Sequence, residues 1–208
     1  MARSKSSNSW LERHVKDPYV RKARTEGYRS RAAFKLIEVD KRDRLFRPGM
    51  RVVDLGAAPG GWCQVAASRV MPGGKVIAVD LLEIAPMSDV TVFRGDFREQ
   101  AMQAELVTAL DGLQADVVLS DMSPNISGIA SADQARATEL VSVAIDFCRS
   151  QLQPEGAFLV KVFHGEEFAG LLKEMKASFR QVRTLKPAAS REESRETYLL
   201  ARGLKGIQ

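Results

Sequence analysis

The first 50 residues have a helical pattern of polar and apolar positions. Asp17 followed by Pro18 is typical of a helix N-terminus, because aspartate caps the first turn and proline suits its first position. Ser30 is predicted to cap a second helix over residues 31–44. Pro48-Gly49 then marks a boundary.

From residue 51 onward, short apolar runs alternate with amphipathic stretches. The runs predicted to be strands span residues 51–55, 75–80, 90–96, 115–121, 156–163, 179–185 and 196–202. Helices are predicted over residues 61–70, 98–110, 133–152 and 166–179. Because no helix fits between the last two strands, they are predicted to form an antiparallel hairpin.

This order of elements predicts an α/β fold. Its centre is a Rossmann-like, mostly parallel sheet of seven strands, with the last strand antiparallel and helices on both faces. Residues 1–50 are expected to form a basic arm that belongs to the same domain as residues 51–208. In open sheets of this kind, ligands bind at the carboxyl ends of the strands.

Composition narrows the class of protein. The chain has 208 residues and no run of about 18 apolar residues, so it is not expected to span a membrane. Its N-terminus lacks the apolar segment of a secretory signal. Cys63 and Cys148 are expected to be buried and reduced, which favours the cytoplasm. No long apolar stripe calls for a second chain, so a monomer is expected.

Positive charge is concentrated at the N-terminus. Residues 1–50 carry 14 Lys/Arg and 6 Asp/Glu, whereas the remainder carries 17 and 20. A basic arm favours a polyanionic partner such as nucleic acid, although a solvated helix face has the same composition. Four aromatic side chains within the arm suit stacking on bases: Trp10, Tyr19, Tyr28 and Phe34.

The strand over residues 51–55 runs into a loop of small residues, Gly56-Ala57-Ala58-Pro59-Gly60-Gly61. Glycines let a backbone approach a ligand closely, and the following helix presents its free N–H groups to it. The spacing D-x-G-x-x-x-G differs from the dinucleotide fingerprint and is that of class I S-adenosylmethionine-dependent methyltransferases. By itself such a loop could also be a tight strand–helix turn.

Three acids at successive strand ends strengthen this interpretation. Asp80 is placed to accept hydrogen bonds from ribose hydroxyls and Asp96 from an adenine amino group, and Asp121 ends the fourth strand. A single such acid is usually a turn residue, but three lie on the ligand-binding edge. Trp62 follows the last loop glycine, where its indole could lie near the ligand or in the core.

At DLGAAPGGW, SDMSPNISG, LVKVF and SRETYLLA, the chain resembles the FtsJ/RrmJ type of ribosomal RNA 2′-O-ribose methyltransferase. The likeness runs from about Trp10 to the end, with Ser123 as a small departure from the frequent alanine. It implies a catalytic set of Lys35, Asp121, Lys161 and Glu196. It also implies an S-adenosylmethionine site at Gly60, Trp62, Asp80, Asp96 and Asp121.

The resemblance further implies the reaction, which is methyl transfer to the 2′-oxygen of an A-loop uridine in 23S RNA of the assembled 50S subunit. Lys35 and burial favour a neutral Lys161 amine, whereas the acids favour its ammonium form. Lys161 is therefore predicted only to orient the oxygen and to stabilise or accept developing charge. Lys35 and Glu196 are expected to hold Lys161 or to steer the ribose.

The remaining basic residues are expected to bind RNA phosphates, namely Arg21, Lys22, Arg24, Arg29, Arg31 and the loop 186–195. No metal is expected, because His14 and His164 are too scattered to form a ligand cluster, although His164 could line the substrate cleft. Two alternatives remain open from the residues: a small-molecule O-methyltransferase and a non-catalytic RNA-binding module.

Overall fold

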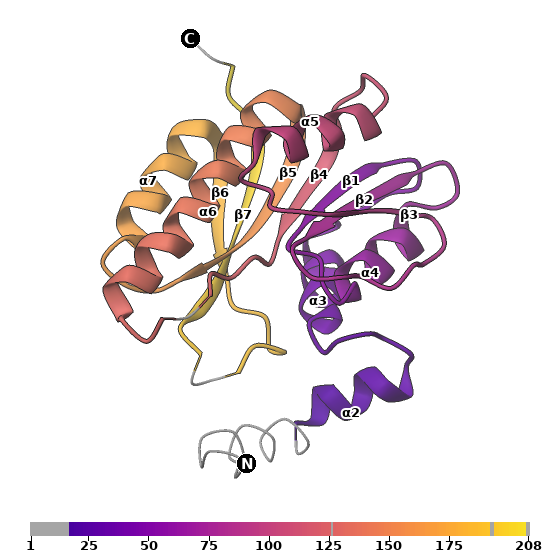
Figure 1. Ribbon diagram of the computed structural model, residues 1–208, viewed down its shortest axis with the longest axis horizontal. Coiled ribbons are helices and arrows are strands. Elements are labelled where there is room, and N and C mark those ends of the chain that lie inside the picture. The colour runs from indigo at the N-terminus through magenta and orange to yellow at the C-terminus, as the bar shows by residue number, and fades with distance from the viewer. Residues whose placement is uncertain (1–16, 126, 192–193, 207–208) are drawn as a thin grey trace.

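The computed structural model describes residues 17–125, 127–191 and 194–206 (Figure 1). The helices are α2 (Pro18–Thr25), α3 (Ala33–Asp43), α4 (Gly61–Val70), α5 (Gln100–Ala109), α6 (Ala130–Gln151) and α7 (Phe168–Ser178). The strands are β1 (Arg51–Leu55), β2 (Lys75–Asp80), β3 (Val90–Arg94), β4 (Ala115–Ser120), β5 (Leu152–Phe163), β6 (Phe179–Leu185) and β7 (Glu196–Leu204).

One seven-stranded sheet has the order β3-β2-β1-β4-β5-β7-β6. Strands β1 to β5 pair in parallel, whereas β7 pairs antiparallel with both β5 and β6. The predicted α/β fold, the mostly parallel sheet and the final antiparallel hairpin are therefore confirmed. Successive strands are added on one side of β1 up to β3 and on its other side from β4 onward. Sheets of this kind bind ligands at this switch point, between β1 and β4.

Helices cover both faces of the sheet, as predicted. Side chains of α5, α6 and α7 pack on one face, against Val53, Ile77 and Phe158. Side chains of α3 and α4 pack on the other face, against Val52 and Val76. Neighbouring residues of a strand thus enter different cores, as the pleat requires. Figure 1 shows α6 and α7 beside each other and α2 apart, below α3.

Some predicted boundaries were wrong at positions where distant parts of the chain meet. Strand β3 ends at Arg94, two residues before the expected end. Strand β5 begins four residues earlier than expected, because Leu152 pairs with Ala115 across a register shift. Ser30 does not cap α3: the N-cap is Ala32, which makes no side-chain cap. The Asp17 cap is confirmed, since its carboxylate accepts the backbone N–H of Tyr19 at 2.9 Å.

Three of the four aromatic residues of the arm, Tyr19, Tyr28 and Phe34, form a cluster; Phe34 is buried in it, whereas stacking of the half-buried Tyr19 and Tyr28 on bases stays a prediction. Phe34 is buried, and its ring centroid lies 5.7 Å from that of Tyr19 and 5.5 Å from that of Tyr28. These contacts pack α2 against α3 and remove the apolar rings from water. Trp10 and His14 lie outside the described residues.

Cys63 and Cys148 are buried free thiols, as expected. In the part of the chain that the structure describes, no helix is long and apolar enough to cross a bilayer.

Candidate active site

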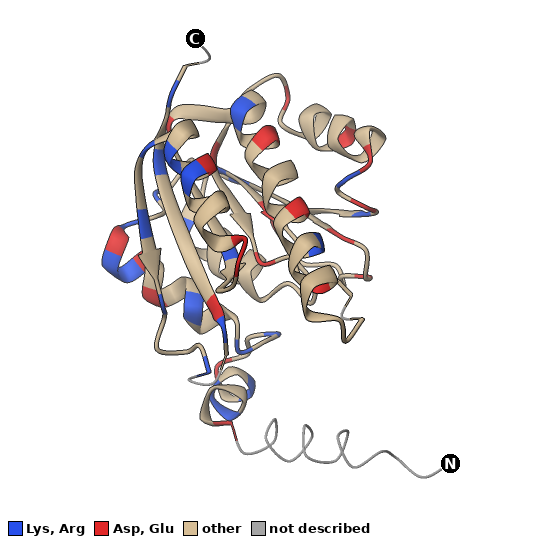
Figure 2. Ribbon diagram, turned by 90° about the vertical axis from the view of Figure 1, so that its left-hand side faces the viewer, with Lys and Arg blue, Asp and Glu red and all other residues tan. Residues whose placement is uncertain are grey.

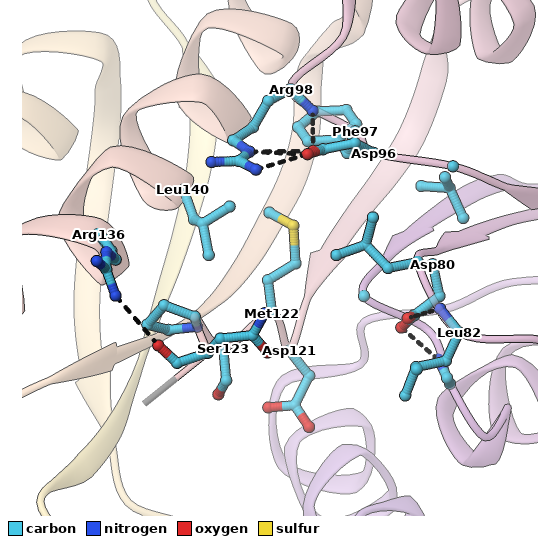
Figure 3. Close-up of a pocket in the computed structure, with 17 residues that line it drawn as sticks. Asp80, Leu82, Asp96, Phe97, Arg98, Asp121, Met122, Ser123, Arg136 and Leu140 are labelled. Carbon is cyan, nitrogen blue, oxygen red and sulfur yellow. Dashed lines mark hydrogen bonds and ion pairs between the residues drawn. The ribbon is translucent and has the colours of Figure 1, made fainter. Parts of the chain in front are cut away.

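A cleft of about 550 Å³ opens at the carboxyl ends of β1, β2 and β4, where the strand order predicted it. Its volume lies within the range of about 300–1,000 Å³ that is usual for small-molecule sites. Figure 3 shows Asp80, Asp96 and Asp121 on different sides of this cleft, with Met122 between them. The remaining lining residues are Gly56, Ala58, Val79, Leu81, Leu82, Gly95, Phe97, Arg98, Ser123, Pro124, Asn125, Arg136 and Leu140.

The glycines of the β1–α4 loop are needed mainly because other parts of the chain approach it closely. A Cβ atom on Gly56 would lie 2.9 Å from the Met122 backbone. One on Gly60, whose φ is +105°, would lie 2.5 Å from Met87 Cε. One on Gly61 would collide with the Ser30 hydroxyl. Gly60 is not among the residues that line the cleft, and its contact with a cofactor stays a prediction.

Asp80 connects two loops from inside the cleft. Its Oδ2 accepts the backbone N–H of Ala58 at 2.9 Å, and its Oδ1 accepts that of Leu82 at 2.8 Å (Figure 3). Each carboxylate oxygen has a second lone pair, so both can still accept a hydrogen bond from a ligand hydroxyl.

Asp96 lies in the cleft but is already paired with a protein cation. The guanidinium of Arg98 donates through Nε and Nη2, the latter at 2.6 Å, and the Arg98 backbone N–H donates at 2.9 Å (Figure 3). The hydrogen bonds from Arg98 lower the pKa of Asp96, so the carboxylate stays ionised. Arg98 also lines the cleft, although no motif in the sequence predicted it.

Asp121 and Lys161 form a close pair at the edge of the cleft. Lys161 Nζ donates to the Asp121 carbonyl at 2.7 Å and lies 3.2 Å from its Oδ1. The two residues come from the ends of the neighbouring strands β4 and β5. The side chain of Lys161 is only 8% exposed, so its ammonium is held by these contacts rather than by bulk water.

Lys35 and Glu196 complete the set of four residues, which the fold brings together from four elements. Lys35 projects from α3, and its Nζ lies 2.6 Å from Glu196 Oε1 at the start of β7. In the β5–β7 pairing, Glu196 stands opposite Phe163, and Phe163 follows Lys161 by two residues along β5. All four residues therefore lie at one edge of the sheet.

Tyr198 links the two ion pairs. Its hydroxyl donates to Asp121 Oδ1 at 3.0 Å and accepts from Lys35 Nζ at 3.0 Å. Burial, aided by the Asp121 and Glu196 carboxylates, raises the pKa of Tyr198 far above its usual value, so the hydroxyl keeps its proton. The sequence offered only one signal for this residue, its place two positions after Glu196 on the same face of a strand.

Trp62 supports the site from the core. Its side chain is 3% exposed, its Nε1 donates to the Ala32 carbonyl at 2.8 Å, and its ring lies 5.8 Å from that of Tyr198. The indole does not line the cleft, so the core alternative for this side chain is correct. A contact between its backbone and a cofactor remains a prediction.

Asp54 lies beneath the glycine loop as a fully buried carboxyl group. Cys63 Sγ donates to its Oδ2 at 3.0 Å, and its Oδ1 has no hydrogen-bond partner. Desolvation is the main reason why the pKa of Asp54 rises from 3.8 to about 7, and the Asp121 and Asp80 carboxylates add to it. Burial likewise raises the pKa of the Cys63 thiol, which makes it a poor nucleophile.

Basic residues of the arm divide into two groups. Arg29 and Arg31 bind protein groups: Arg29 donates to three backbone carbonyls, and Arg31 donates to Asp17 and to the Ala189 carbonyl. Arg21 and Arg24 are exposed on α2, where Figure 2 shows basic residues. The guanidinium groups of Arg29 and Arg31 thus make contacts within the fold, and their expected binding of phosphate stays a prediction.

Three further residues of the predicted site, His164, Lys186 and Arg191, do not line the cleft. His164 is exposed beyond β5, where its ring lies 4.6 Å from that of Phe168 and outside the cleft lining. Lys186 donates to the Ser194 carbonyl, and Arg191 lies 3.6 Å from Asp17. Among the described residues, no three His, Cys, Asp or Glu side chains are placed to hold a metal ion.

The chain is similar to known methyltransferases over nearly its whole length. The FtsJ-like methyltransferase family matches residues 28–204. A protein of Azoarcus sp. (strain BH72), named ribosomal RNA large subunit methyltransferase E, is 53% identical over 99% of this chain and 100% of its own. A protein of the same name from Nitrosospira multiformis is 53% identical over 98% of both chains.

Solved structures include a similar protein. A crystal structure from Plasmodium falciparum, named as a ribosomal RNA methyltransferase, has a TM-score of 0.78 and is 28% identical. The match covers 86% of this chain and 100% of that one. The similarity therefore extends from the sequence to the arrangement of the elements.

Proposed function

The chain belongs to the FtsJ-like methyltransferase family, and we propose that it transfers a methyl group from S-adenosylmethionine to the 2′-oxygen of a ribose in 23S RNA of the large ribosomal subunit. The predicted family and the predicted class of enzyme, a ribosomal RNA methyltransferase, are both confirmed by the relatives. An A-loop uridine as the target, the assembled subunit as substrate, the cytoplasm and a monomeric state belong to the proposal.

The observation that carries the proposal is the position of Lys161. Its amine is held by Asp121 at the edge of a cleft that also contains the acids Asp80 and Asp96. A cation beside the cleft suits a reaction in which negative charge develops on an attacking oxygen. No Ser, Cys or metal centre is needed for such a transfer.

The cleft suits S-adenosylmethionine in its donor and acceptor groups. Asp80 has lone pairs for ribose hydroxyls, Asp96 supplies an acceptor beyond its Arg98 contacts, and Leu81 and Leu82 offer apolar surface. When bound, the cofactor supplies an activated methyl group on a sulfonium. The acids of the cleft favour such a cation, because opposite charges attract strongly in a partly desolvated site.

The residues beside the cleft would orient the acceptor. Lys161 would hold the 2′-oxygen in line and stabilise the negative charge that develops as the hydroxyl proton passes to solvent, while Asp121 fixes the Lys161 amine. Lys35 and Glu196 act one step further away, through Tyr198. Aligning the reactants in this way can lower a barrier by about 7–11 kcal/mol.

Labelled S-adenosylmethionine and large subunits that lack the modification test the proposal. Label on a ribose 2′-oxygen is the expected result, and naked 23S RNA in parallel shows whether the assembled subunit is required. A folded protein that labels no ribose would overturn the proposal, and labelling of a small molecule alone would favour the O-methyltransferase. Salt-sensitive RNA binding without cofactor binding would favour the non-catalytic module.

Lys161→Ala should lower the rate of transfer by about a hundredfold or more, because the oxygen loses its positioned cation. Cofactor affinity should change little, since Lys161 does not line the cleft. Lys173→Ala, which removes an exposed lysine of α7, is the matched control and should behave as the wild type. Full activity of Lys161→Ala would refute the assigned role.

A further inference from the structure

The guanidinium of Arg29 joins two loops, each of which also contributes a lining residue to the cleft, Ala58 or Leu82. Nη1 donates to the Pro59 carbonyl at 3.3 Å and to the Ala85 carbonyl at 2.6 Å, and Nη2 donates to the Pro86 carbonyl at 2.9 Å. Pro59 belongs to the glycine loop, and the other two residues belong to the loop after β2. One planar group therefore connects both loops from their outer side.

The same two loops are connected from the inner side by Asp80. Its carboxylate accepts the N–H of Ala58 in the glycine loop and that of Leu82 in the loop after β2. Ala58 and Leu82 both line the cleft. The spacing of the two loops, and with it the width of the cleft, thus depends on an inner carboxylate and an outer guanidinium.

The backbone beside Arg29 is fixed to the start of α4. The Arg29 N–H donates to Gln64 Oε1 at 2.7 Å, and Gln64 Nε2 donates to the Gly27 carbonyl at 3.0 Å. A Cβ atom on Gly60 would lie 3.1 Å from Arg29 Nη1. These contacts place the guanidinium against the glycine loop.

We propose that Arg29 is a positioning residue for the cofactor cleft, which it holds in shape through the Pro59, Ala85 and Pro86 carbonyls. The inference rests on the proposed function, because it takes S-adenosylmethionine as the ligand of the cleft. It gives one residue of the basic arm a role in cofactor binding and leaves phosphate binding to exposed residues such as Arg24.

Calorimetric titration of the full chain with S-adenosylmethionine tests this role. Arg29→Ala should weaken cofactor binding about tenfold, because a charged group that makes three hydrogen bonds is lost. Arg29→Lys should lose most of the same affinity, since an ammonium keeps the charge but not the planar fork. Under saturating cofactor, kcat should stay within about twofold while KM for the cofactor rises by the same factor as Kd.

Arg24→Ala is the matched control, since it removes an equal charge from an exposed position of the arm. It should leave cofactor affinity unchanged and weaken binding to large subunits, whereas Arg29→Ala should do the opposite. Gln64→Ala should weaken cofactor binding in the same direction as Arg29→Ala, because it releases the backbone on both sides of Tyr28. Thermal unfolding verifies that each variant is folded.

The outcomes separate the inference from the proposed function. Wild-type protein that binds no S-adenosylmethionine would overturn both. Wild-type binding with unchanged affinity in Arg29→Ala and Arg29→Lys would overturn the inference alone. Weaker binding to subunits in Arg29→Ala, with normal binding in Arg29→Lys and normal cofactor affinity in both, would instead assign Arg29 to phosphate.

Discussion

Tyr198 shows how a single hydroxyl organises the residues beside the cleft. It is fully buried, it separates Lys35 from Asp121, and it bonds to both. Two partly buried ion pairs share this neutral hydroxyl as a bridge and hold each other in place, because each charge keeps a partner in a partly desolvated region. The position of Lys161 thus depends on Tyr198, which stands opposite it in the β5–β7 pairing and donates to its partner Asp121.

Tyr198→Phe should lower kcat about tenfold and leave cofactor affinity within about twofold, because Asp121 loses a hydrogen bond while the ring packing on Trp62 remains. Single-turnover assays with large subunits and calorimetry measure the two effects. Tyr198→Leu, which also removes the ring, should in addition lower the melting temperature. A wild-type kcat in Tyr198→Phe would show that Tyr198 contributes packing only.

Asp54 makes stability depend on pH. The folded state holds its proton up to about pH 7, whereas the unfolded chain releases it near the ordinary value of 3.8. Between these two values the unfolded state binds fewer protons, so the free energy of unfolding falls as pH rises. Below the lower value both states are protonated and this cost is absent.

Asp54→Asn should remove this part of the pH dependence, which amounts to roughly 1.4 kcal/mol for each pH unit within the window. Urea unfolding of both proteins at pH 5 and at pH 7.5 measures it. The variant should gain stability relative to the wild type at the higher pH. Parallel changes in the two proteins would show that Asp54 titrates normally.

At the scale of elements, helix α2 is held against the rest of the fold by a small set of contacts. Asp17 caps the helix and pairs with Arg31, which in turn donates to the Ala189 carbonyl in the loop before β7. Ala23, Phe34 and Ala189 form a small apolar cluster beneath it. The arm is therefore attached both to α3 and to the loop that leads to Glu196.

Asp17→Ala should destabilise α2 by about 1–2 kcal/mol, because the helix loses its cap and Arg31 loses its carboxylate. In Asp17→Ala, amide hydrogen exchange of residues 18–25 should be faster than in the wild type and faster than exchange of the sheet. Asp17→Asn is the matched variant, since asparagine caps a helix equally well but carries no charge. Equal protection of α2 in all three proteins would contradict this account of how the helix is held.

At the scale of the whole molecule, the exposed positive charge of the arm lies apart from the cleft. The exposed basic residues of α2 lie on the arm, whereas the cleft contains three carboxylates and two arginines, Arg98 and Arg136, of which Arg98 is paired with Asp96 (Figures 2 and 3). Under the proposed function, the cationic cofactor would meet the carboxylates of the cleft and the polyanionic RNA would meet the basic residues of the arm. This separation lets one small domain attract both partners without placing the phosphates against Asp80 and Asp121.

The double variant Arg21→Ala/Arg24→Ala should weaken binding to large subunits and should reduce the slope of log K against log salt by about one to two. Filter binding between 50 and 200 mM salt, as an approximate range, measures that slope. Cofactor affinity serves as the control and should not change. An unaltered salt dependence would show that RNA phosphates bind elsewhere.

Much of the fold could be predicted from the sequence because its causes are local. The bounds of β1, α4, β2 and β6 agree with the apolar runs, since strand and helix periods are properties of neighbouring residues. Lys35, Asp121, Lys161 and Glu196 were predicted through resemblance, and the fold brings them together. Tyr198 was missed because its partners, Lys35 and Asp121, are far from it in the sequence and meet it only in the fold. Arg98 was missed although its partner Asp96 is only two residues away, because residue types alone do not show which way the two side chains point.

The sequence by itself determined the alternation of strands and helices, the acids at the strand ends and the basic arm, because each is a matter of residue type and spacing along the chain. Only the tertiary structure decided what individual polar and aromatic residues do. Arg29 and Arg24 look alike in the sequence, yet only Arg29 reaches the carbonyls of two distant loops. The physical reason is that hydrogen bonds act over about 3 Å, so long-range partners exist only once the chain is folded.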